Sequence, residues 1–307
     1  MDRRGRAVGA RRLDVFEALG TELRFRTAID GHPCKGASCV LLPGKHCYED
    51  PRDCMIDTID HGAAVRELRL NRPPVNALSN ELIRSLHQAL KLAAQDGVRA
   101  LVLSGSPGRF SGGLDVPLLL TLDRSRIADL WHEFYALLGA IAQSPIPIAA
   151  AITGHAPAGG TVLALFCDWR VMAEGEYQIG LNEVQVGIEL PPILMAAFRR
   201  LIGPRKSEQL AVSGELIFAE EALRIGLVDD LAPPAQVAGR ALQWCQKLLD
   251  LPQEAMLGTR REARLDLTAL FQTNLEPELE RVIASWWRPE TQHTLQALAQ
   301  RLSKNKS

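Results

Sequence analysis

The stretch that decides the fold and chemistry of this chain reads Gly180-Leu181-Asn182-Glu183-Val184-Gln185-Val186-Gly187-Ile188. It places one carboxylate, Glu183, between a strand-like and a helix-like segment, downstream of the pair Gly159-Gly160. Its neighbours are largely apolar, and an apolar environment raises the pKa of a carboxyl group. Such a base suits the removal of a weakly acidic C–H proton. A lone glutamate in a loop is usually a solvated side chain, so the other motifs have to decide between these interpretations.

The composition is that of an ordinary globular protein with room for a large core. The chain has 307 residues, of which 47% are hydrophobic and 23% charged, and its formal net charge is −1. No basic stripe indicates nucleic acid or a membrane surface as a partner. The longest apolar run, residues 138–166, is interrupted by prolines and glycines. It therefore predicts buried helix, strand and turn rather than a membrane span.

Residues 1–54 differ from the rest of the chain. Arginines cluster near the start, but acidic residues and the scarcity of serine argue against a transit peptide. Four cysteines without paired C-x-x-C spacing, and without a signal-peptide core before them, favour neither a zinc site nor a secreted disulfide module. These are Cys34, Cys39, Cys47 and Cys54. We predict a mobile or accessory extension, with a natural start at Met55 as the alternative.

From Met55 onward, strand-like and helix-like segments alternate. The predicted strands are residues 64–70, 98–103, 146–152 and 169–172. The predicted helices follow Ser79, span residues 123–143, and follow Gly159-Gly160. This alternation predicts right-handed crossover units and an α/β core. After Leu190 the pattern is mainly helical, over residues 193–202, 206–212, 219–225, 236–249 and 276–302, with an interruption at Pro289.

Two glycine-rich loops each follow a predicted strand. The first runs from Arg109 to Asp115 and the second from Gly154 to Val162, where it opens a helix. Glycine permits positive φ and close approach of a ligand, and helix N-terminal N–H groups bind oxyanions. Each loop could equally be a tight turn or a close packing point. The second lacks the lysine of a P-loop and the spacing of a dinucleotide fingerprint, and no nucleophile pattern supports a catalytic role for His155.

Taken in order, these motifs resemble those of the crotonase superfamily of coenzyme A thioester enzymes, from Met55 to about Leu302. The resemblance rests on Asn76-Ala77-Leu78, Phe110-Ser111-Gly112-Gly113-Leu114-Asp115, Ala158-Gly159-Gly160, Cys167-Asp168-Trp169-Arg170 and Gly180-Leu181-Asn182-Glu183. Pro157 to Gly160 and Gly180 to Ile188 are most similar to the mitochondrial-type Δ3,Δ2-enoyl-CoA isomerases. The resemblance implies an α/β fold, a ββα superhelix over residues 55–250. A helical region over residues 251–307 would assemble homotrimers or dimers of trimers.

The resemblance also implies a role for each matching residue. The backbone N–H groups of Leu114 and Gly159 would hold the thioester oxygen while an enolate forms, and Glu183 would be the catalytic base. Hydratases of this superfamily use two glutamates, and the first of these positions is Val162 here. One base suffices to move a double bond, which predicts conversion of 3-enoyl-CoA into 2-trans-enoyl-CoA in fatty acid β-oxidation. The implied substrate-binding residues are Asn76, Ala77, Leu78, Gly112, Gly113, Asp115, Val116 and Asn182.

We expect no metal and no cofactor, because coenzyme A is part of the substrate, and a cytoplasmic or, in a eukaryote, a mitochondrial matrix location. The chain departs from the isomerase pattern at Gly113 and at Glu189-Leu190-Pro191-Pro192. Glu189 could line the acyl pocket or face solvent. Trp286 and Trp287 would suit either a subunit contact or the core. The alternatives are a hydratase or lyase that uses Glu189 as a second acid, and a catalytically silent protein that binds coenzyme A esters. A dinucleotide-binding oxidoreductase has the least support.

Overall fold

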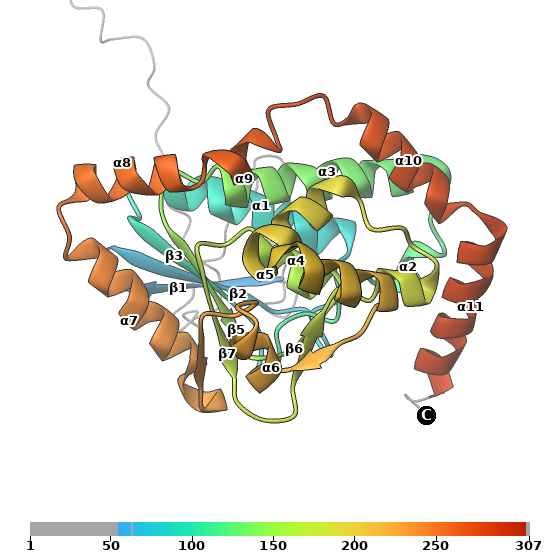
Figure 1. The fold of residues 1–307 in the computed structure, drawn as a ribbon, viewed down its shortest axis with the longest axis horizontal. Coiled ribbons are helices and arrows are strands. Elements are labelled where there is room, and N and C mark those ends of the chain that lie inside the picture. Colours follow the sequence, from blue (N-terminus) through green and yellow to red (C-terminus); the bar gives the residue numbers. More distant parts are fainter. Residues whose placement is uncertain (1–54, 63, 305–307) are drawn as a thin grey trace, which may run out of the picture. The chain divides into compact units, whose positions relative to one another are not determined.

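The computed structural model describes residues 55–62 and 64–304 (Figure 1). The predicted N-terminal extension and its four cysteines lie outside the described residues. Most strands belong to a six-stranded sheet with the order β1-β2-β3-β5-β7-β10. These strands are β1 (Ile56–His61), β2 (Val65–Leu70), β3 (Ala100–Ser104), β5 (Ile148–Ile152), β7 (Trp169–Ala173) and β10 (Asp230–Ala232). All neighbours pair in parallel except β1 and β2, as the predicted α/β alternation requires.

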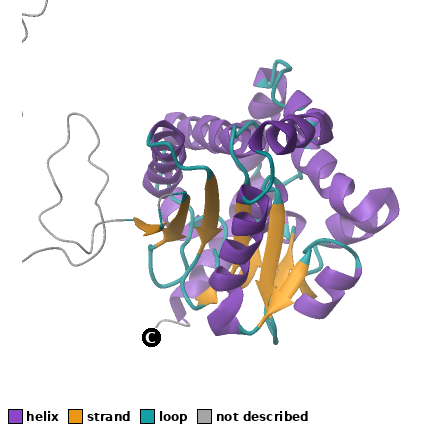
Figure 2. Ribbon diagram, turned by 90° about the vertical axis from the view of Figure 1, so that its left-hand side faces the viewer, coloured by secondary structure: helices purple, strands orange, loops and turns teal. Residues whose placement is uncertain are grey.

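The central strands of this sheet are buried on both faces, as parallel sheets generally are. Every residue of β3 and β5 is buried. One face packs on the large core that includes α1 (Asn80–Gln95) and α3 (Arg124–Ala142), and the other packs on α7 (Val237–Leu249). Figure 2 shows the strands as an inner layer with helices around them. Cys167 and Cys245 are free and buried and belong to the core.

The sequence marks the starts of the long helices clearly. The Ser79 side chain accepts a hydrogen bond of 3.3 Å from the Leu82 N–H and caps α1. The Asp123 carboxylate caps α3 by accepting from the Arg126 N–H at 2.9 Å. Both residues satisfy N–H groups that a helix leaves without internal partners. The predicted beginnings of these two helices are therefore confirmed.

A second, smaller sheet positions the glycine-rich loops. Its strands have the order β4-β6-β8-β9 and comprise β4 (Gly108–Arg109), β6 (Gly154–Pro157), β8 (Gln178–Gly180) and β9 (Ile217–Phe218). β4, β6 and β8 run parallel to one another. The chain leaves the carboxyl ends of these strands into the loops that contain Leu114, Gly159 and Glu183. Because the carboxyl ends of neighbouring parallel strands share one edge, this sheet brings together three loops that are far apart in sequence.

Helices make up most of the remaining chain. α5 (Pro192–Ser213) is broken at Gly203, where φ is 75°, so it corresponds to the two predicted helices. The others are α6 (Ala219–Arg224), α8 (Gln253–Ala263), α9 (Leu265–Ala269), α10 (Glu276–Trp286) and α11 (Pro289–Lys304). The predicted interruption at Pro289 separates α10 from α11. Trp286 is 1% exposed and belongs to the core of its own chain, which removes it as a subunit contact.

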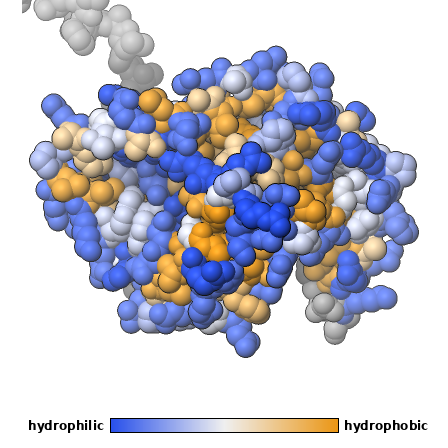
Figure 3. All heavy atoms as spheres, viewed as in Figure 1, coloured by the Kyte–Doolittle hydropathy of each residue, from blue (hydrophilic) through white to orange (hydrophobic). Residues whose placement is uncertain are grey.

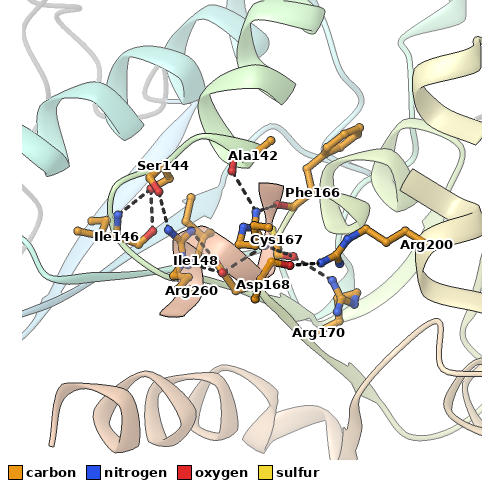
Figure 4. A network of polar contacts seen from close by, with 12 residues as sticks. Ala142, Ser144, Ile146, Ile148, Phe166, Cys167, Asp168, Arg170, Arg200 and Arg260 are labelled. Carbon is orange, nitrogen blue, oxygen red and sulfur yellow. Dashed lines mark hydrogen bonds and ion pairs between the residues drawn. The ribbon is translucent and has the colours of Figure 1, made fainter. Parts of the chain in front are cut away.

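A buried ion-pair network anchors α8 to the main sheet (Figure 4). Asp168, just before β7, accepts from Arg260 Nε at 2.7 Å and Nη2 at 2.9 Å. It also pairs with Arg264 Nη1 at 3.2 Å and accepts from the Ile148 N–H at 2.8 Å. Arg170 donates to Asp229 at 2.7 Å. The Cys167-Asp168-Trp169-Arg170 motif therefore has a structural role, since paired carboxylates and guanidiniums replace the hydration lost on burial.

The surface in Figure 3 is largely hydrophilic, with apolar residues gathered in the middle of the face around α5 and α6. Large exposed apolar side chains on or near these helices include Val212, Phe218 and Leu223. Within residues 55–62 and 64–304, no helix is both long and apolar enough to span a bilayer. The same residues contain no group of three or more His, Cys, Asp or Glu side chains arranged to hold a metal ion.

Candidate active site

The two glycine-rich loops touch at Gly113 and Gly159. A Cβ added at Gly113, where φ is +79°, would lie 3.2 Å from the Pro157 carbonyl oxygen and 3.3 Å from the Gly159 nitrogen. A Cβ at Gly159 would lie 3.3 Å from Gly113 Cα and 2.8 Å from Leu78 Cδ1. The absence of side chains thus lets two backbones approach each other closely. Because Gly113 is bonded directly to Leu114, the N–H groups of Leu114 and Gly159 belong to neighbouring stretches of backbone.

Neither of these two N–H groups is used by the local secondary structure. Leu78 donates to the Gly113 carbonyl at 2.7 Å and accepts from the Asp115 N–H at 3.0 Å. These two bonds lie on either side of Leu114, so this pairing does not use the Leu114 N–H. Gly159 is the first residue of α4 (Gly159–Leu165), and the first N–H groups of a helix have no partner within it. Two donors are therefore left at the contact between the loops.

Hydrogen bonds hold the Gly159 loop in a strained backbone conformation. Ala158, immediately before α4, has φ 47°, which is unusual for a residue with a side chain. Its N–H donates to the Gly180 carbonyl at 2.9 Å, and the Gly180 N–H donates to Thr161 Oγ1 at 2.8 Å. These bonds join the beginning of α4 to the end of β8. The start of the Glu183 loop is thereby fixed against the Gly159 loop.

Asn76 fixes the first loop from behind and is 1% exposed. Its φ is 52°, and its side chain accepts from the Arg72 N–H at 2.9 Å and donates to the Phe110 carbonyl at 3.1 Å. Its carbonyl accepts from Ser111 Oγ at 2.8 Å, and Ser111 Oγ in turn accepts from the Gly113 N–H at 3.2 Å. The geometry gives Asn76 a positioning role for the segment that carries the Leu114 N–H.

Glu183 begins a short 3-10 helix, η2 (Glu183–Val186), just beyond β8. The residue is half-buried, while its carboxylate oxygen Oε2 is shielded from solvent and has no hydrogen-bond partner among the described residues. Burial raises the pKa of the Glu183 carboxyl to about 7, and a hydrogen bond from its own backbone N–H opposes this shift. Burial disfavours the charged form of a carboxyl group, so this side chain can both take up and release a proton near neutral pH.

Glu183 and both loops line a cavity of about 220 Å³. Val162, which is 1% exposed, forms part of its wall. Among the described lining residues Glu183 is the one acid. The lining residues are Gly112, Leu114, Val116, Trp131, Phe134, Pro157, Ala158, Gly159, Val162, Asn182, Glu183, Val186, Ile188, Pro191, Leu194, Leu298 and Leu302.

The sequence-predicted substrate-binding residues divide into two groups. Three of them line the cavity, namely Gly112, Val116 and Asn182, together with the two predicted oxyanion-hole residues, Leu114 and Gly159. The other five are not among its lining residues, namely Asn76, Ala77, Leu78, Gly113 and Asp115. Asp115 caps α2 (Val116–Leu119) by accepting from the Leu118 N–H at 3.2 Å, and it pairs with Arg72 at 2.6 Å. These contacts favour a supporting role for Asp115 over direct contact with a ligand.

Glu189 lies outside this cavity. Its side chain is 70% exposed and pairs with Arg288 Nη1 at 3.2 Å. It lines a different, smaller hollow of about 150 Å³ with Glu278 and Arg281. The sequence left Glu189 either in the acyl pocket or facing solvent, and the structure places it at the solvent-exposed surface. A second acid in the cavity would have to come from elsewhere.

Sequence reasoning missed the helical part of the cavity wall. Its side chains come from α3, α5 and α11 and are Trp131, Phe134, Leu194, Leu298 and Leu302. Each occupies the apolar side of an amphipathic helix, and the same pattern is typical of a side chain that simply packs in a core. No signal in the sequence separates the two cases.

Comparison with known proteins identifies the family of this chain. Residues 60–285 match the family model described as enoyl-CoA hydratase/isomerase. This chain is a member of that family, the crotonases. Among crotonases it is 33% identical over 250 residues to human mitochondrial enoyl-CoA delta isomerase 1, covering 80% of this chain and 83% of that protein. It is 34% identical over 223 residues to a "probable enoyl-CoA hydratase", EchA17, of Mycobacterium avium, covering 72% and 84% of the two chains.

Solved crotonase structures confirm the fold. The crystal structure of human mitochondrial Δ3,Δ2-enoyl-CoA isomerase matches with a TM-score of 0.78 and 32% identity, over 82% of this chain and all of that one. An enoyl-CoA hydratase, EchA3, of Mycobacterium ulcerans matches with a TM-score of 0.68 and 28% identity, over 76% and 99%. The predicted crotonase-like fold is thus confirmed. Relatives named as isomerases and as hydratases are similarly close, so the comparisons identify an enzyme of the enoyl-CoA hydratase/isomerase family.

Proposed function

We propose that this crotonase is a Δ3,Δ2-enoyl-CoA isomerase, which converts 3-enoyl-CoA into 2-trans-enoyl-CoA in fatty acid β-oxidation. The observation that carries the proposal is the composition of the cavity wall, in which Glu183 is the one acid among the described residues and Val162 is apolar. Adding water across a double bond requires groups that activate the water and protonate the product. A double-bond shift requires a single group that takes a proton and gives it back.

The proposed reaction proceeds through an enolate. The Glu183 carboxylate removes a proton from C2 of the 3-enoyl thioester, and the electron pair of that C–H bond moves onto the thioester oxygen. The Leu114 and Gly159 N–H groups donate hydrogen bonds to this oxygen as its negative charge develops. The enolate then collapses, the double bond forms between C2 and C3, and Glu183 returns its proton at C4. The atoms and charges balance without an added reactant.

The environment of Glu183 suits both halves of this reaction. A pKa near 7 leaves a substantial fraction of the carboxyl group deprotonated at neutral pH and makes its proton easy to return. Val162 and the other apolar lining residues provide no group that could hold an attacking water. Asn182, beside Glu183 in the wall, has a buried Oδ1 without a partner in the described part of the chain. The thioester has no donor for this acceptor, so we propose that the Asn182 side chain orients Glu183 while the Glu183 carboxyl group is protonated.

Hydration is the second candidate, because a relative named as a hydratase is as similar as the isomerase. A hydratase that uses Glu189 as its second acid loses support, since Glu189 pairs with Arg288 outside the cavity. The third candidate, a silent protein that binds coenzyme A esters, has no observation in its favour over an enzyme with Glu183 present.

The partners and location are part of the same proposal. An acyl-CoA thioester is the substrate, no separate cofactor is required, and the chain assembles as a homotrimer or a dimer of trimers. We propose a cytoplasmic location, or the mitochondrial matrix in a eukaryote; for the latter, the support is that the human relative is a mitochondrial protein. Light scattering of the purified protein tests the assembly directly.

The proposal is tested by two substrates given to the same enzyme preparation. Trans-3-hexenoyl-CoA should be converted to the conjugated 2-enoyl product, seen as an increase in ultraviolet absorbance. Crotonyl-CoA should not gain water, as monitored by the loss of the same absorbance. Hydration of crotonyl-CoA at a comparable rate would replace the isomerase with a hydratase. Binding of both thioesters without turnover of either would favour the silent protein.

A further inference from the structure

The catalytic base of the proposed reaction belongs to a weak element. η2 is a four-residue 3-10 helix, and none of its residues is fully buried. Such a helix has poorer hydrogen-bond geometry than an α-helix, and elements with few buried contacts open easily. Removal of a proton from carbon requires a carboxylate that is held close to the reacting atom. Contacts from outside η2 must therefore fix Glu183.

Among the described residues, two side-chain hydrogen bonds tie η2 to neighbouring helices. Gln185 Nε2 donates to the Gly214 carbonyl, at the end of α5, at 2.8 Å. Thr291 Oγ1, in the first turn of α11, donates at 2.7 Å to the carbonyl of Gly187, which ends η2. Gln185 is exposed, whereas Thr291 is 1% exposed. Since a hydrogen bond is stronger where water is excluded, Thr291 provides the firmer anchor.

The Thr291 bond reaches the Glu183 backbone through one peptide unit. Its acceptor, the Gly187 carbonyl, shares a peptide plane with the Ile188 N–H, and that N–H donates to the Glu183 carbonyl at 3.1 Å. The hydrogen bonds therefore run from Thr291, across the peptide between Gly187 and Ile188, to Glu183. Bonds in such a chain polarise and strengthen one another. Rotation of this peptide would weaken both bonds, so the Thr291 hydroxyl holds the peptide that holds the Glu183 main chain.

The same helix packs closely on η2 and forms part of the cavity wall. Gly187 has φ +75°, and a Cβ added there would lie 3.1 Å from Thr291 Cα and 3.4 Å from Thr291 Oγ1. Leu298 and Leu302 follow Thr291 on one face of α11, and both line the cavity with Glu183. Thr291 itself is not among the lining residues. Its hydroxyl therefore acts on the backbone of η2, away from the substrate.

We propose that Thr291 is a positioning residue of this enzyme, which holds η2 so that the Glu183 carboxylate meets C2 and C4 of the substrate. It acts through the peptide between Gly187 and Ile188. The inference rests on the proposed function, in which Glu183 moves the proton, and it adds to that function a residue of the C-terminal helix that the cavity lining does not reveal.

Three variants of the full chain separate the hydroxyl from the rest of the side chain. Thr291→Val keeps the shape of threonine and removes the donor. Thr291→Ser keeps the donor and removes the methyl group. Thr294→Val is the matched control, because Thr294 Oγ1 donates to the Glu290 carbonyl of the same helix at 2.9 Å and not to η2. If Thr291→Val does not fold, Thr291→Ala removes the same donor without placing a methyl group against the Gly187 carbonyl.

The test combines turnover of trans-3-hexenoyl-CoA with hydrogen exchange of a peptide that contains Ile188. In Thr291→Val, kcat should fall about tenfold to 100-fold, since small displacements of reacting groups cost this much. Affinity for saturated hexanoyl-CoA should stay within about twofold, because the lost interaction is not a substrate contact. The Ile188 amide should exchange faster as its bond to Glu183 opens more often. Thr291→Ser should restore most of kcat and of the protection, and Thr294→Val should match the wild type.

The outcomes distinguish this inference from the isomerase proposal. Wild-type kcat in Thr291→Val overturns the inference, and so does a fall in kcat without faster exchange at Ile188. Equal losses in Thr291→Ser, or in Thr294→Val, also overturn it, because they would assign the effect to the shape of the side chain or to α11 in general. If the wild type hydrates crotonyl-CoA instead, and hydration depends on the Thr291 hydroxyl in the same way, the inference stands and the isomerase is rejected. Binding of both thioesters without turnover of either rejects both.

Discussion

Glu183 and Val162 line the same cavity, and Glu183 is the one of the two that can exchange a proton. Val162 lies in the first helix after the Gly159 loop, and Glu183 lies beyond the next strand of the small sheet. Parallel pairing of β6 and β8 brings the two segments together. Because the Val162 side chain cannot ionise, Glu183 is the one described side chain of this cavity with a carboxyl proton to exchange.

Replacing Glu183 by glutamine should reduce kcat for trans-3-hexenoyl-CoA about a thousandfold, because general acid–base catalysis of this kind contributes on that order. The amide has nearly the same shape and cannot accept the C2 proton. Affinity for a saturated acyl-CoA should change little, since the variant retains both backbone donors. Turnover that persists within tenfold of the wild type would mean that another group is the base.

The pH dependence of activity should follow the Glu183 pKa of about 7. The base must be deprotonated in the free enzyme, so kcat/KM should rise tenfold per pH unit below that pKa and level off above it. A rate profile measured with trans-3-hexenoyl-CoA between pH 5 and pH 9 gives this value directly. A profile that is already flat at pH 5 would place the catalytic carboxyl in a water-like environment and contradict the burial seen here.

The same group should make the protein less stable at higher pH. Between the ordinary value of 4.5 and the folded value of about 7, the unfolded chain loses its Glu183 proton while the folded chain keeps it. The folded state then binds more protons, so the free energy of unfolding falls as pH rises through this window. The loss is at most about 3–4 kcal/mol, at roughly 1.4 kcal/mol per pKa unit. Urea unfolding at pH 5 and pH 8 should show a smaller difference in Glu183→Gln than in the wild type.

The sequence predicts the long helices and four of the six strands of the main sheet, β2, β3, β5 and β7, because their signals are local. The strands at the two edges of that sheet, β1 and β10, were missed. Ser79 caps α1, and Asp123 caps α3, as N-cap preferences predict. The small sheet escapes prediction because its strands have two to four residues, and β6 contains Gly154 and Pro157, which are typical of a turn. α8 was also missed. It buries no residue, so it has no apolar period to detect.

The candidate site was predicted residue by residue, but its assembly was not. Leu114, Gly159 and Glu183 are each identifiable from their motifs, while their convergence depends on the pairing of β4, β6 and β8. Such pairings join residues distant in sequence and leave no local pattern. The positioning roles of Asn76 and Asp115 were missed for the same reason, since Asn76 donates to Phe110 and Asp115 pairs with Arg72, both distant in sequence.

Introducing a second carboxylate should add hydratase activity. In Val162→Glu, a second acid enters the wall of the cavity that Glu183 lines and can hold or protonate a water, so hydration of crotonyl-CoA should become measurable. Val162→Gln has a similar volume without the acid and should show none. Val162 is 1% exposed, so both variants should lower the melting temperature through burial of a polar group. A folded Val162→Glu enzyme that binds acyl-CoA without hydrating crotonyl-CoA would show that water has no place in this cavity.

Filling the space between the glycine-rich loops should disable the enolate site. Gly113→Ala would place a Cβ 3.3 Å from the Gly159 nitrogen and push the two donors apart, and loss of one such donor typically lowers kcat by about 100-fold. Gly97→Ala is the matched control, because Gly97 has the same φ of +79° with no neighbour within 4 Å. Both variants carry a similar backbone strain, of about 1–2 kcal/mol. Equal kcat values for the two variants would argue against a role for this contact in catalysis.

The buried network around Asp168 should matter for stability. In Asp168→Asn, the guanidinium groups of Arg260 and Arg264 lose their shared counter-charge, and leaving buried charges unpaired costs about 3–5 kcal/mol. Asp266→Asn is the control, because Asp266 is 62% exposed in its pair with Arg200, and exposed pairs contribute at most about 1 kcal/mol. Urea unfolding of the two variants measures the difference. Asp168, Arg260 and Arg264 do not line the Glu183 cavity. The folded variant should therefore keep a kcat close to that of the wild type, although its free energy of unfolding is lower. Equal stability of both variants would mean that solvent reaches the network and hydrates the arginines.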